Sequence, residues 1–447
     1  MIRYNVYIAM IRQVTIDIEQ RYTLPENLKI VKFKEVYIAI AVETACWIVL
    51  DNDSQLKFFN LLRDKTIKES LDEFDGDMND ARWVLTQIEA RQFCSDECHP
   101  FKEQVCMIYL TNKCNLRCPH CFLSAGEAKQ NEMSTDEIFS LIGNLAANGF
   151  KEVTFSGGEI ALHPRLTDIV DCAYRHGMDV SLLTNGILWD RRMVEQVADK
   201  IASVQISIDG FSEEENSRMR GAGNFEKALE TVDLFMEKGV RTQVAMTPYP
   251  DDTLKGKIAE FAKFAKSLKA RYGNSNRLKI VFTSGFMDGR EISLSRQQRD
   301  AYSDTMNHVI QEYLEEDAKD YPFILDHQQR KIMTNCSYGC PNISSDGDVY
   351  ICSRSGLKPV ANIRTHTMNE IMDISRRASA LSEINNLEPC NRCHLKYICG
   401  GGCRIDEFPA MKTGPYKLDR APGRECNESV KNEFYELMIR TNKLIFQ

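Results

Sequence analysis

Three cysteines follow one another closely in the motif Cys114-Asn-Leu-Arg-Cys118-Pro-His-Cys121, which we call the cysteine loop. The loop comes after the apolar run Val105 to Leu110, which predicts a buried strand. Cysteine thiolates are the usual ligands of iron–sulfur clusters, which normally take four of them. A triplet would leave one iron open to another ligand. A zinc site whose fourth ligand lies elsewhere is the alternative, so the loop by itself predicts a metal–sulfur centre of either kind.

Composition limits the class of protein that holds this centre. At 447 residues, the chain is long enough for two or three domains. A net charge of −8 and the lack of a basic stripe argue against a nucleic-acid partner. The N-terminus lacks a signal-peptide pattern, and the most apolar stretch, Val36 to Leu50, is interrupted by Glu43 and too short for a bilayer. We therefore expect a cytoplasmic protein without a membrane partner, in which clusters among the sixteen cysteines indicate metal binding rather than disulfides.

The segment 104–316 alternates apolar strands with helices. One helix opens at Ser134 with Glu137 as its capping partner, and it carries one apolar face before Asn148-Gly149 ends it. Six such units predict an α/β fold, a parallel sheet curled into a partial (β/α)6 barrel of TIM type, with its chemistry at the carboxyl ends of the strands. The expected strands are Gln104–Thr111, Glu152–Ser156, Val180–Thr184, Ser203–Ile208, Thr242–Met246 and Leu278–Thr283.

Unusual residues stand at three further strand ends, and the third strand ends in Thr184-Asn185-Gly186. The second strand ends in Gly157, Gly158 and Glu159, where glycines let a ligand approach the backbone and a carboxylate can hold an ammonium group. The fourth ends in Ser207 and Asp209, whose oxygens suit ribose hydroxyls. Each feature alone would fit an ordinary turn with a helix cap. Together behind the cysteine loop, they indicate a cofactor site.

This combination resembles the radical S-adenosylmethionine (SAM) enzymes across residues 104–316. The resemblance implies that the cysteine loop binds a 4Fe–4S cluster and that SAM chelates its remaining iron. It also implies that Glu159 holds the SAM amino group, that Ser207 and Asp209 hold the ribose, and that Arg220 holds the carboxylate. Relatives often have His-Asp shortly before that arginine, whereas Asn216-Ser217 stands here. One electron from the cluster would cleave SAM to a 5′-deoxyadenosyl radical, which abstracts a substrate hydrogen.

Residues 1–93 predict a separate α+β module. Val36, Ile38, Ile40 and Val42 alternate as on a half-buried strand, Trp47-Ile-Val-Leu50 forms another, and three short helices follow. This winged-helix-like pattern resembles the leader-peptide recognition element of peptide-modifying enzymes over residues 28–93. The resemblance implies that a precursor peptide binds residues 1–93 by adding a strand to the sheet. A docking or dimerisation module is the alternative. Residues 94–103 are expected to be a linker.

Residues 317–447 contain a second group of cysteines. Eight thiolates suffice for two complete four-cysteine sites, and the turn Ser345-Asp-Gly347 before Val349-Tyr-Ile351 predicts a hairpin. Zinc would also suit Cys-x2-Cys spacing. The eight are Cys336, Cys340, Cys352, Cys390, Cys393, Cys399, Cys403 and Cys426.

The arrangement resembles the SPASM extension of radical SAM enzymes, which implies two auxiliary 4Fe–4S clusters, making three clusters in the chain. The interval from Cys340 to Gly347 is shorter than usual, whereas Cys336 gives the usual one, so Cys340 departs from the family pattern. An open site or a smaller cluster is the alternative for the set that contains Cys340. The resemblance implies one ligand set of Cys336, Cys340, Cys352 and Cys403 and another of Cys390, Cys393, Cys399 and Cys426.

Joined together, these parts predict a radical SAM maturase of ribosomally made peptides. It would capture a precursor's leader and form an intramolecular thioether or carbon–carbon crosslink, with the auxiliary clusters taking up the electron. An external donor such as a flavodoxin or ferredoxin-like protein would supply the first electron. The alternative is an anaerobic sulfatase-maturing enzyme that forms formylglycine, although Ser353-Arg354 follows Cys352 where that branch carries Asp. A non-enzymatic zinc protein would leave Glu159, Ser207 and Asp209 unexplained. The sequence names no catalytic acid or base.

Overall fold

The computed structural model describes residues 16–101, 105–314, 330–353, 358–408, 418–419, 421, 426 and 428–446. The chain forms two compact units, each assembled from separate stretches of sequence. The first, called here the mixed unit, comprises 1–103, 321–336 and 381–447, and the second, the barrel unit, comprises 104–320 and 337–380. The division into modules at 93, 103 and 316 stays a prediction.

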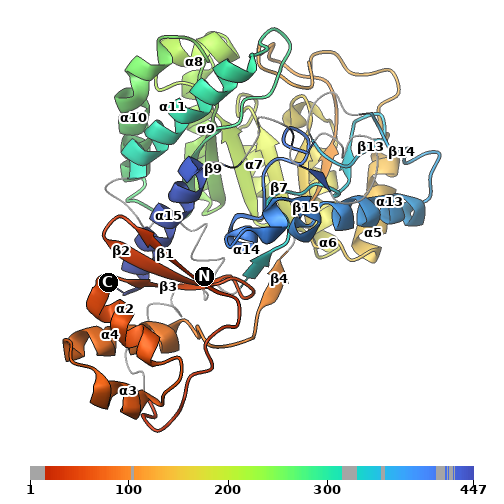
Figure 1. Cartoon of the computed structure of the whole chain (residues 1–447). Coiled ribbons are helices and arrows are strands. Elements are labelled where there is room, and N and C mark those ends of the chain that lie inside the picture. The colour runs from red at the N-terminus through yellow and green to blue at the C-terminus, as the bar shows by residue number, and fades with distance from the viewer. Residues whose placement is uncertain are drawn as a thin grey trace. The chain divides into compact units, whose positions relative to one another are not determined.

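The barrel unit contains a parallel sheet in the order β10-β9-β8-β7-β6-β5, and this sheet confirms the predicted α/β fold (Figure 1). The observed bounds lie within two residues of the predicted ones, while Gln104 lies outside the described residues. The strands are β5 Val105–Tyr109, β6 Glu152–Ser156, β7 Asp179–Thr184, β8 Ser203–Ser207, β9 Arg241–Met246 and β10 Leu278–Phe282.

Helices connect these strands and bury their apolar faces against the sheet or one another. The predicted capping box at the start of α5 is confirmed, because the Ser134 side chain accepts from the Glu137 N–H and Glu137 accepts from the Ser134 N–H. The helices are α5 Thr135–Ala147, α6 Leu166–Arg175, α7 Arg191–Val197, α8 Glu213–Arg220, α9 Phe225–Glu237, α10 Ile258–Arg271 and α11 Arg296–Leu314, with the 3-10 turns η2 Ile160–Leu162 and η3 Leu254–Lys257.

The sheet continues beyond β5 into the cysteine-rich part of the sequence. The strand β12 (Asn342–Ile343) runs parallel to β5, and β13 (Asp348–Tyr350) and β14 (Ala361–Asn362) follow it antiparallel. The predicted hairpin is thereby confirmed, with Gly347 at a positive φ of 83° in its turn. Helix α13 (Met368–Leu381) comes next. Cys352 therefore follows the strand β13, in the sheet to which the cysteine loop is attached.

The mixed unit is built on an antiparallel sheet of β1 (Leu28–Phe33), β2 (Val36–Ala41) and β3 (Cys46–Leu50). One face, with Ile48 and Leu50, packs on the three helices that follow, α2 Asp53–Leu61, α3 Ile67–Glu73 and α4 Met78–Ala90. The opposite face packs on the C-terminal part of the same unit. The remaining elements of the mixed unit are β4 His99–Phe101, β11 Arg330–Ile332, η5 Ile384–Asn386, β15 Leu387–Glu388, η6 Cys390–Arg392, α14 Lys396–Cys399, β16 Leu418–Asp419 and α15 Glu428–Phe446.

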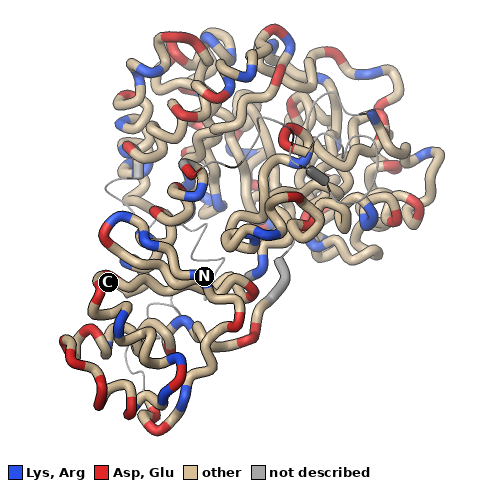
Figure 2. Tube along the Cα trace, viewed as in Figure 1, with Lys and Arg blue, Asp and Glu red and all other residues tan. Residues whose placement is uncertain are grey.

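That second face gives the mixed unit a shared core. Trp47 is fully buried against Phe408 and Met438, and its indole N–H donates to the Met438 carbonyl at 3.3 Å. The winged-helix-like sheet is thus covered on both faces. Charges of both signs are interspersed along each unit (Figure 2). Among the described residues, none of the helices has the length and apolarity needed to cross a membrane.

Candidate active site at the carboxyl edge of the sheet

The cysteine loop follows β5 and closes on itself through backbone hydrogen bonds. The Cys114 N–H donates to Gly126 O, and the Gly126 N–H donates to Asn112 O, both at 2.9 Å. Two sulfurs accept backbone hydrogen bonds at 3.4 Å, Cys114 from Leu116 and Cys121 from Ala125. Such bonds are among the features that tune iron–sulfur clusters.

The three thiols lie close enough to influence one another. Burial raises the pKa of Cys114 to about 11, and the neighbouring Cys118 and Cys121 add to the rise. Among the described residues, no three His, Cys, Asp or Glu side chains are grouped in a way that could hold a single metal ion. Three thiols on one loop, with N–H groups donating to sulfur, are a donor set that fits a cluster.

The glycines at the end of β6 allow it to pack directly against the start of the cysteine loop. A Cβ on Gly158 would lie 2.6 Å from the Lys113 carbonyl carbon and closer still to its oxygen. Gly157 has a φ of 143°, and a Cβ there would meet the backbone of Thr111. The Gly158 N–H donates to Thr111 O at 2.7 Å. The structure thus gives both glycines a packing role, and their contact with a ligand stays a prediction.

Glu159 is fully buried and joins the ends of β6 and β7. Its carboxylate accepts from the Thr184 hydroxyl at 2.6 Å, the Asn185 N–H at 2.8 Å and the Ala161 N–H at 3.0 Å. Burial raises the pKa of Glu159, and these hydrogen bonds oppose the rise. The side-chain amide of Asn185 in turn donates to Oδ1 of Asn115, in the cysteine loop, at 2.9 Å. Three hydrogen-bond donors therefore fix the Glu159 carboxylate, and Asn185 connects it to the cysteine loop.

Asp209 follows β8 and is the centre of a buried polar group. Its Oδ2 accepts from Arg220 Nε at 2.6 Å, and its Oδ1 accepts from the Thr247 N–H at 2.7 Å. Asn216, which stands where relatives often carry His, accepts from the Asp209 N–H at 2.9 Å. Ser207, the last residue of β8, is half-buried. The structure thus brings Asp209 and Arg220 together as an ion pair.

His120, which belongs to the cysteine loop, lies next to this polar group. Its Nε2 lies 3.5 Å from Asp209 Oδ2, and its buried Nδ1 has no hydrogen-bond partner among the described residues. Burial lowers the pKa of His120 to about 4, so the imidazole is neutral at pH 7. The electrostatic influence of Arg220 and Asp209 also reaches Cys118. Glu159, Asp209 and Arg220 therefore lie beside the cysteine loop, whereas no contact joins Ser207 to the loop among the described residues.

Two further residues bind the cysteine loop or the residues that flank it, and sequence reasoning missed both. The Glu132 carboxylate accepts from the Asn112 N–H at 2.6 Å and from the Thr111 hydroxyl at 2.8 Å. Arg290, after β10, donates to the carbonyls of Cys118 and Ala125. Neither residue belongs to a motif or a periodic pattern, so their contacts leave no signal in the sequence.

Four of the later cysteines gather within the mixed unit. Burial raises the pKa of Cys399 to about 12, and Cys426, Cys390 and Cys393 add to the rise. These are the four thiols of the second predicted auxiliary set, and their role as cluster ligands stays a prediction. In the other set, Cys336 and Cys403 belong to the mixed unit and Cys340 and Cys352 to the barrel unit, so that set also stays a prediction.

Comparisons with known proteins agree with this geometry. Residues 108–265 match the model of the Radical SAM superfamily. The mycofactocin maturase MftC of Mycobacterium tuberculosis is 32% identical over 190 residues, which are 40% of this chain and 46% of MftC. The antilisterial bacteriocin subtilosin biosynthesis protein AlbA of Bacillus subtilis is 28% identical over 253 residues, which are 55% of this chain and 53% of AlbA. The chain thus spans about half the length of these curated relatives.

Solved structures show the same fold. The crystal structure of Streptococcus suis SuiB bound to S-adenosylmethionine aligns with 90% of this chain and 100% of SuiB, with a TM-score of 0.52 and 17% identity. The structure of anSMEcpe with bound AdoMet aligns with 76% of this chain and 99% of its own, with a TM-score of 0.56 and 20% identity. Residues 108–265 therefore form a radical SAM domain, which is an enzyme domain and implies SAM and a 4Fe–4S cluster as cofactors.

Proposed function

We propose that this protein is a radical SAM maturase that modifies a ribosomally made precursor peptide by forming an intramolecular thioether or carbon–carbon crosslink. The observation that carries the proposal is the cysteine loop, which has the buried Glu159 and the Asp209–Arg220 pair beside it within a radical SAM domain. One relative is named as a mycofactocin maturase and another as a biosynthesis protein of the bacteriocin subtilosin, and both names support a peptide as the substrate class.

Each residue of the site has a role in this proposal. Cys114, Cys118 and Cys121 would hold the cluster, which when bound supplies the electron that cleaves SAM to methionine and a 5′-deoxyadenosyl radical. Glu159 would accept the SAM ammonium group, for which its carboxylate is held in place by Thr184 and Asn185. Glu159 and Asp209 are at most 1% exposed, and this burial would keep water from the groups that they bind.

The sheet of the mixed unit is the proposed leader-binding element. A leader strand that adds to β3 must displace side chains of α4, because these already pair with the outer edge of that strand. Gln87 accepts from the Val49 N–H at 3.0 Å and donates to the Val49 carbonyl at 2.7 Å. Arg91 donates to the Trp47 carbonyl at 2.9 Å. Leader capture at β3 is therefore an exchange of hydrogen bonds rather than an addition to an open edge.

The two auxiliary four-cysteine sets would hold 4Fe–4S clusters that take up the electron left on the substrate after coupling. A flavodoxin or ferredoxin-like protein would reduce the radical SAM cluster. Fully cysteine-ligated clusters suit electron transfer, since burial and hydrogen bonds to sulfur set their potentials. The grouping of Cys390, Cys393, Cys399 and Cys426 supports one of the two sites.

The test uses the full chain, purified without oxygen, with SAM, a reductant and the peptide from a short reading frame beside the gene. We expect a product lighter by two hydrogen atoms, with the crosslink located by fragmentation, and equivalent formation of 5′-deoxyadenosine. Formylglycine in a sulfatase-derived peptide would instead identify the sulfatase-maturing activity. No change in either peptide would contradict the proposal. The leader element is tested by point substitution, because its sheet shares a core with residues 384–439 and deletion would expose that core.

A further inference from the structure

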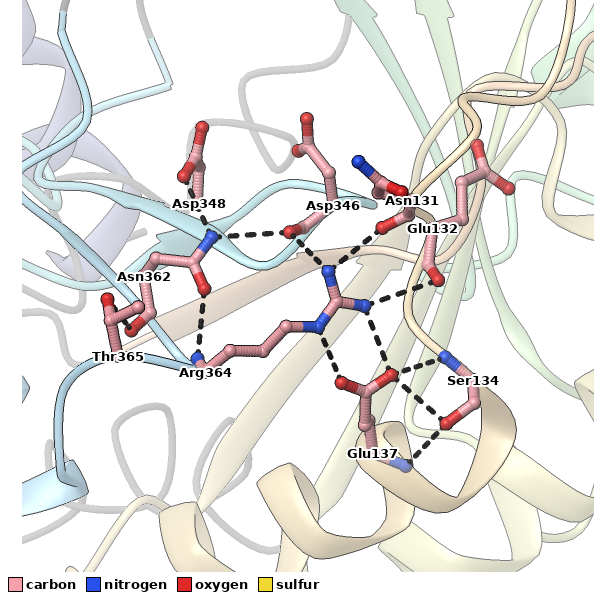
Figure 3. Close-up of polar contacts among 9 residues, drawn as sticks. All are labelled: Asn131, Glu132, Ser134, Glu137, Asp346, Asp348, Asn362, Arg364 and Thr365. Atoms are coloured by element: carbon pink, nitrogen blue, oxygen red, sulfur yellow. Dashed lines mark hydrogen bonds and ion pairs between the residues drawn. The ribbon is translucent and has the colours of Figure 1, made fainter.

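The guanidinium of Arg364, in the turn after β14, makes five hydrogen bonds and thereby joins two segments of the barrel unit (Figure 3). Its Nε and Nη2 donate to the two carboxylate oxygens of Glu137 at 2.6 and 3.1 Å. Its Nη1 donates to the carbonyls of Asn131 and Asp346 at 3.1 and 3.4 Å. Its Nη2 also donates to the carbonyl of Glu132 at 3.4 Å. A guanidinium has five N–H donors in a fixed plane, so every donor of Arg364 has an acceptor here.

One side of this arrangement leads to the cysteine loop. Arg364 holds the backbone of Glu132, and the Glu132 carboxylate accepts from the Asn112 N–H and the Thr111 hydroxyl. The Asn112 carbonyl accepts from Gly126, whose own carbonyl accepts from the Cys114 N–H. A continuous series of hydrogen bonds therefore runs from Arg364 to the first cysteine of the loop.

The other side leads to the hairpin that precedes Cys352. Asp346 lies in the turn between β12 and β13, and its carbonyl accepts from Arg364 and from Asn362 Nδ2. The same Asn362 amide donates to Asp348 Oδ1 at 2.9 Å (Figure 3). The Met133 N–H donates to Ser345 O at 2.6 Å, and Lys129 pairs with Asp346 at 2.9 Å. The hairpin is thus fastened to the segment 129–133 that follows the cysteine loop.

Charge favours the same arrangement. The bidentate contact with Arg364 lowers the pKa of Glu137 to about 2, helped by the N–H of Ser134 in the capping box. A lysine would keep the positive charge but could not offer a planar fork to Glu137 and three carbonyls at once. The three backbone carbonyls are therefore bound because the guanidinium is planar and has several N–H donors, more than because it is charged.

We propose that Arg364 is a positioning residue that fixes the cysteine loop relative to the β12–β13 hairpin, acting through Glu132. The consequence for catalysis rests on the proposed function: a loosened loop would still allow SAM cleavage but would couple it poorly to peptide modification. The positional part does not depend on activity.

The test is amide hydrogen exchange, followed by mass spectrometry, on the full chain with its clusters reconstituted. In Arg364→Lys and Arg364→Gln we expect exchange of residues 112–114 to rise about tenfold or more, because Glu132 no longer holds the Asn112 N–H. The control is Arg376→Lys on α13, whose exposed pair with Asp373 touches neither segment. In a Glu132→Gln background, Arg364→Lys should add no further increase, since both changes act on one path.

Unchanged exchange at 112–114, or an equal rise throughout α9, would overturn the proposal, because the second result means general loosening. Two further measurements concern the loaded enzyme. The EPR spectrum of the reduced protein with SAM should differ between Arg364→Lys and the wild type, and the ratio of 5′-deoxyadenosine to modified peptide should rise at least threefold. If the wild type cleaves no SAM, the proposed function fails, while the exchange result still decides the role of Arg364.

Discussion

Adding one methyl group at Gly158 should displace the cysteine loop. A Cβ there would lie 2.6 Å from the Lys113 carbonyl carbon and 2.7 Å from the Asn112 oxygen, whereas ordinary contact begins at 3.4 Å. The backbone of Asn112 and Lys113, which leads into the cysteine loop, must therefore move, and the Lys113 carbonyl oxygen, which lies nearest to the Cβ, must move furthest. The three nearest atoms all belong to the main chain, so the clash is not with the end of a flexible side chain.

The cost of Gly158→Ala follows from that displacement. Overpacking costs about 1–3 kcal/mol. The hydrogen bonds from the N–H groups of Gly158 and Glu159 to the carbonyls of Thr111 and Lys113 are worth about 0.5–1.5 kcal/mol each. We therefore expect a loss of about 2–6 kcal/mol in the free energy of unfolding, measured with urea, together with a lower iron content.

Gly256→Ala is the matched control, because a Cβ at that position meets nothing within 4 Å. It should change the free energy of unfolding by less than about 1 kcal/mol and leave the iron content unchanged. Equal behaviour of the two variants would refute the argument that close backbone contact at Gly158 positions the cysteine loop.

Three further predictions follow from single contacts. Glu159→Ala removes the acceptor of the buried Thr184 hydroxyl and Asn185 N–H. It should therefore lower the free energy of unfolding by about 2–6 kcal/mol in urea titrations. A loss below about 1 kcal/mol would contradict the assigned hydrogen bonds. Because the folded pKa of Glu137 is lowered to about 2, the stability it contributes is present above its usual pKa and is lost as the pH falls toward 2. The difference in unfolding free energy between the wild type and Arg364→Gln should therefore shrink over that window, and a constant difference would contradict the pairing. Gln87→Ala frees the N–H and carbonyl of Val49 and should tighten leader binding about tenfold by calorimetry, with Thr86→Ala as control; weaker binding would place the leader elsewhere.

Features with a regular spacing could be predicted from the sequence. The six barrel strands, the capping box of Ser134 and Glu137, and the β12–β13 hairpin each carry a periodic or turn signal, and each is present in the structure. The cysteine loop follows its strand as predicted. The strand β1 was not predicted, since its half-buried residues give a weak alternating pattern.

Contacts between distant segments could not be predicted. Phe408 and Met438 pack on the β2–β3 face although more than 300 residues separate them from Trp47 in the sequence. Arg290 binds carbonyls in and after the cysteine loop, and Glu132 binds the Asn112 N–H before it. Arg364 acts on the loop through the Glu132 carbonyl. Any sequence supplies such backbone groups. Such contacts depend on the tertiary structure, so no residue type or spacing in the sequence predicts them.

The most direct test of the central claim compares the wild type with Cys118→Ala, purified and reconstituted without oxygen, with Cys172→Ala on α6 as the control. Iron is quantified, and 5′-deoxyadenosine is measured after adding SAM and a reductant. We expect about twelve irons per chain in the wild type and the control, about four fewer in Cys118→Ala, and 5′-deoxyadenosine only in the first two. A colourless zinc protein, or 5′-deoxyadenosine formed by Cys118→Ala, would contradict the assignment of the cysteine loop.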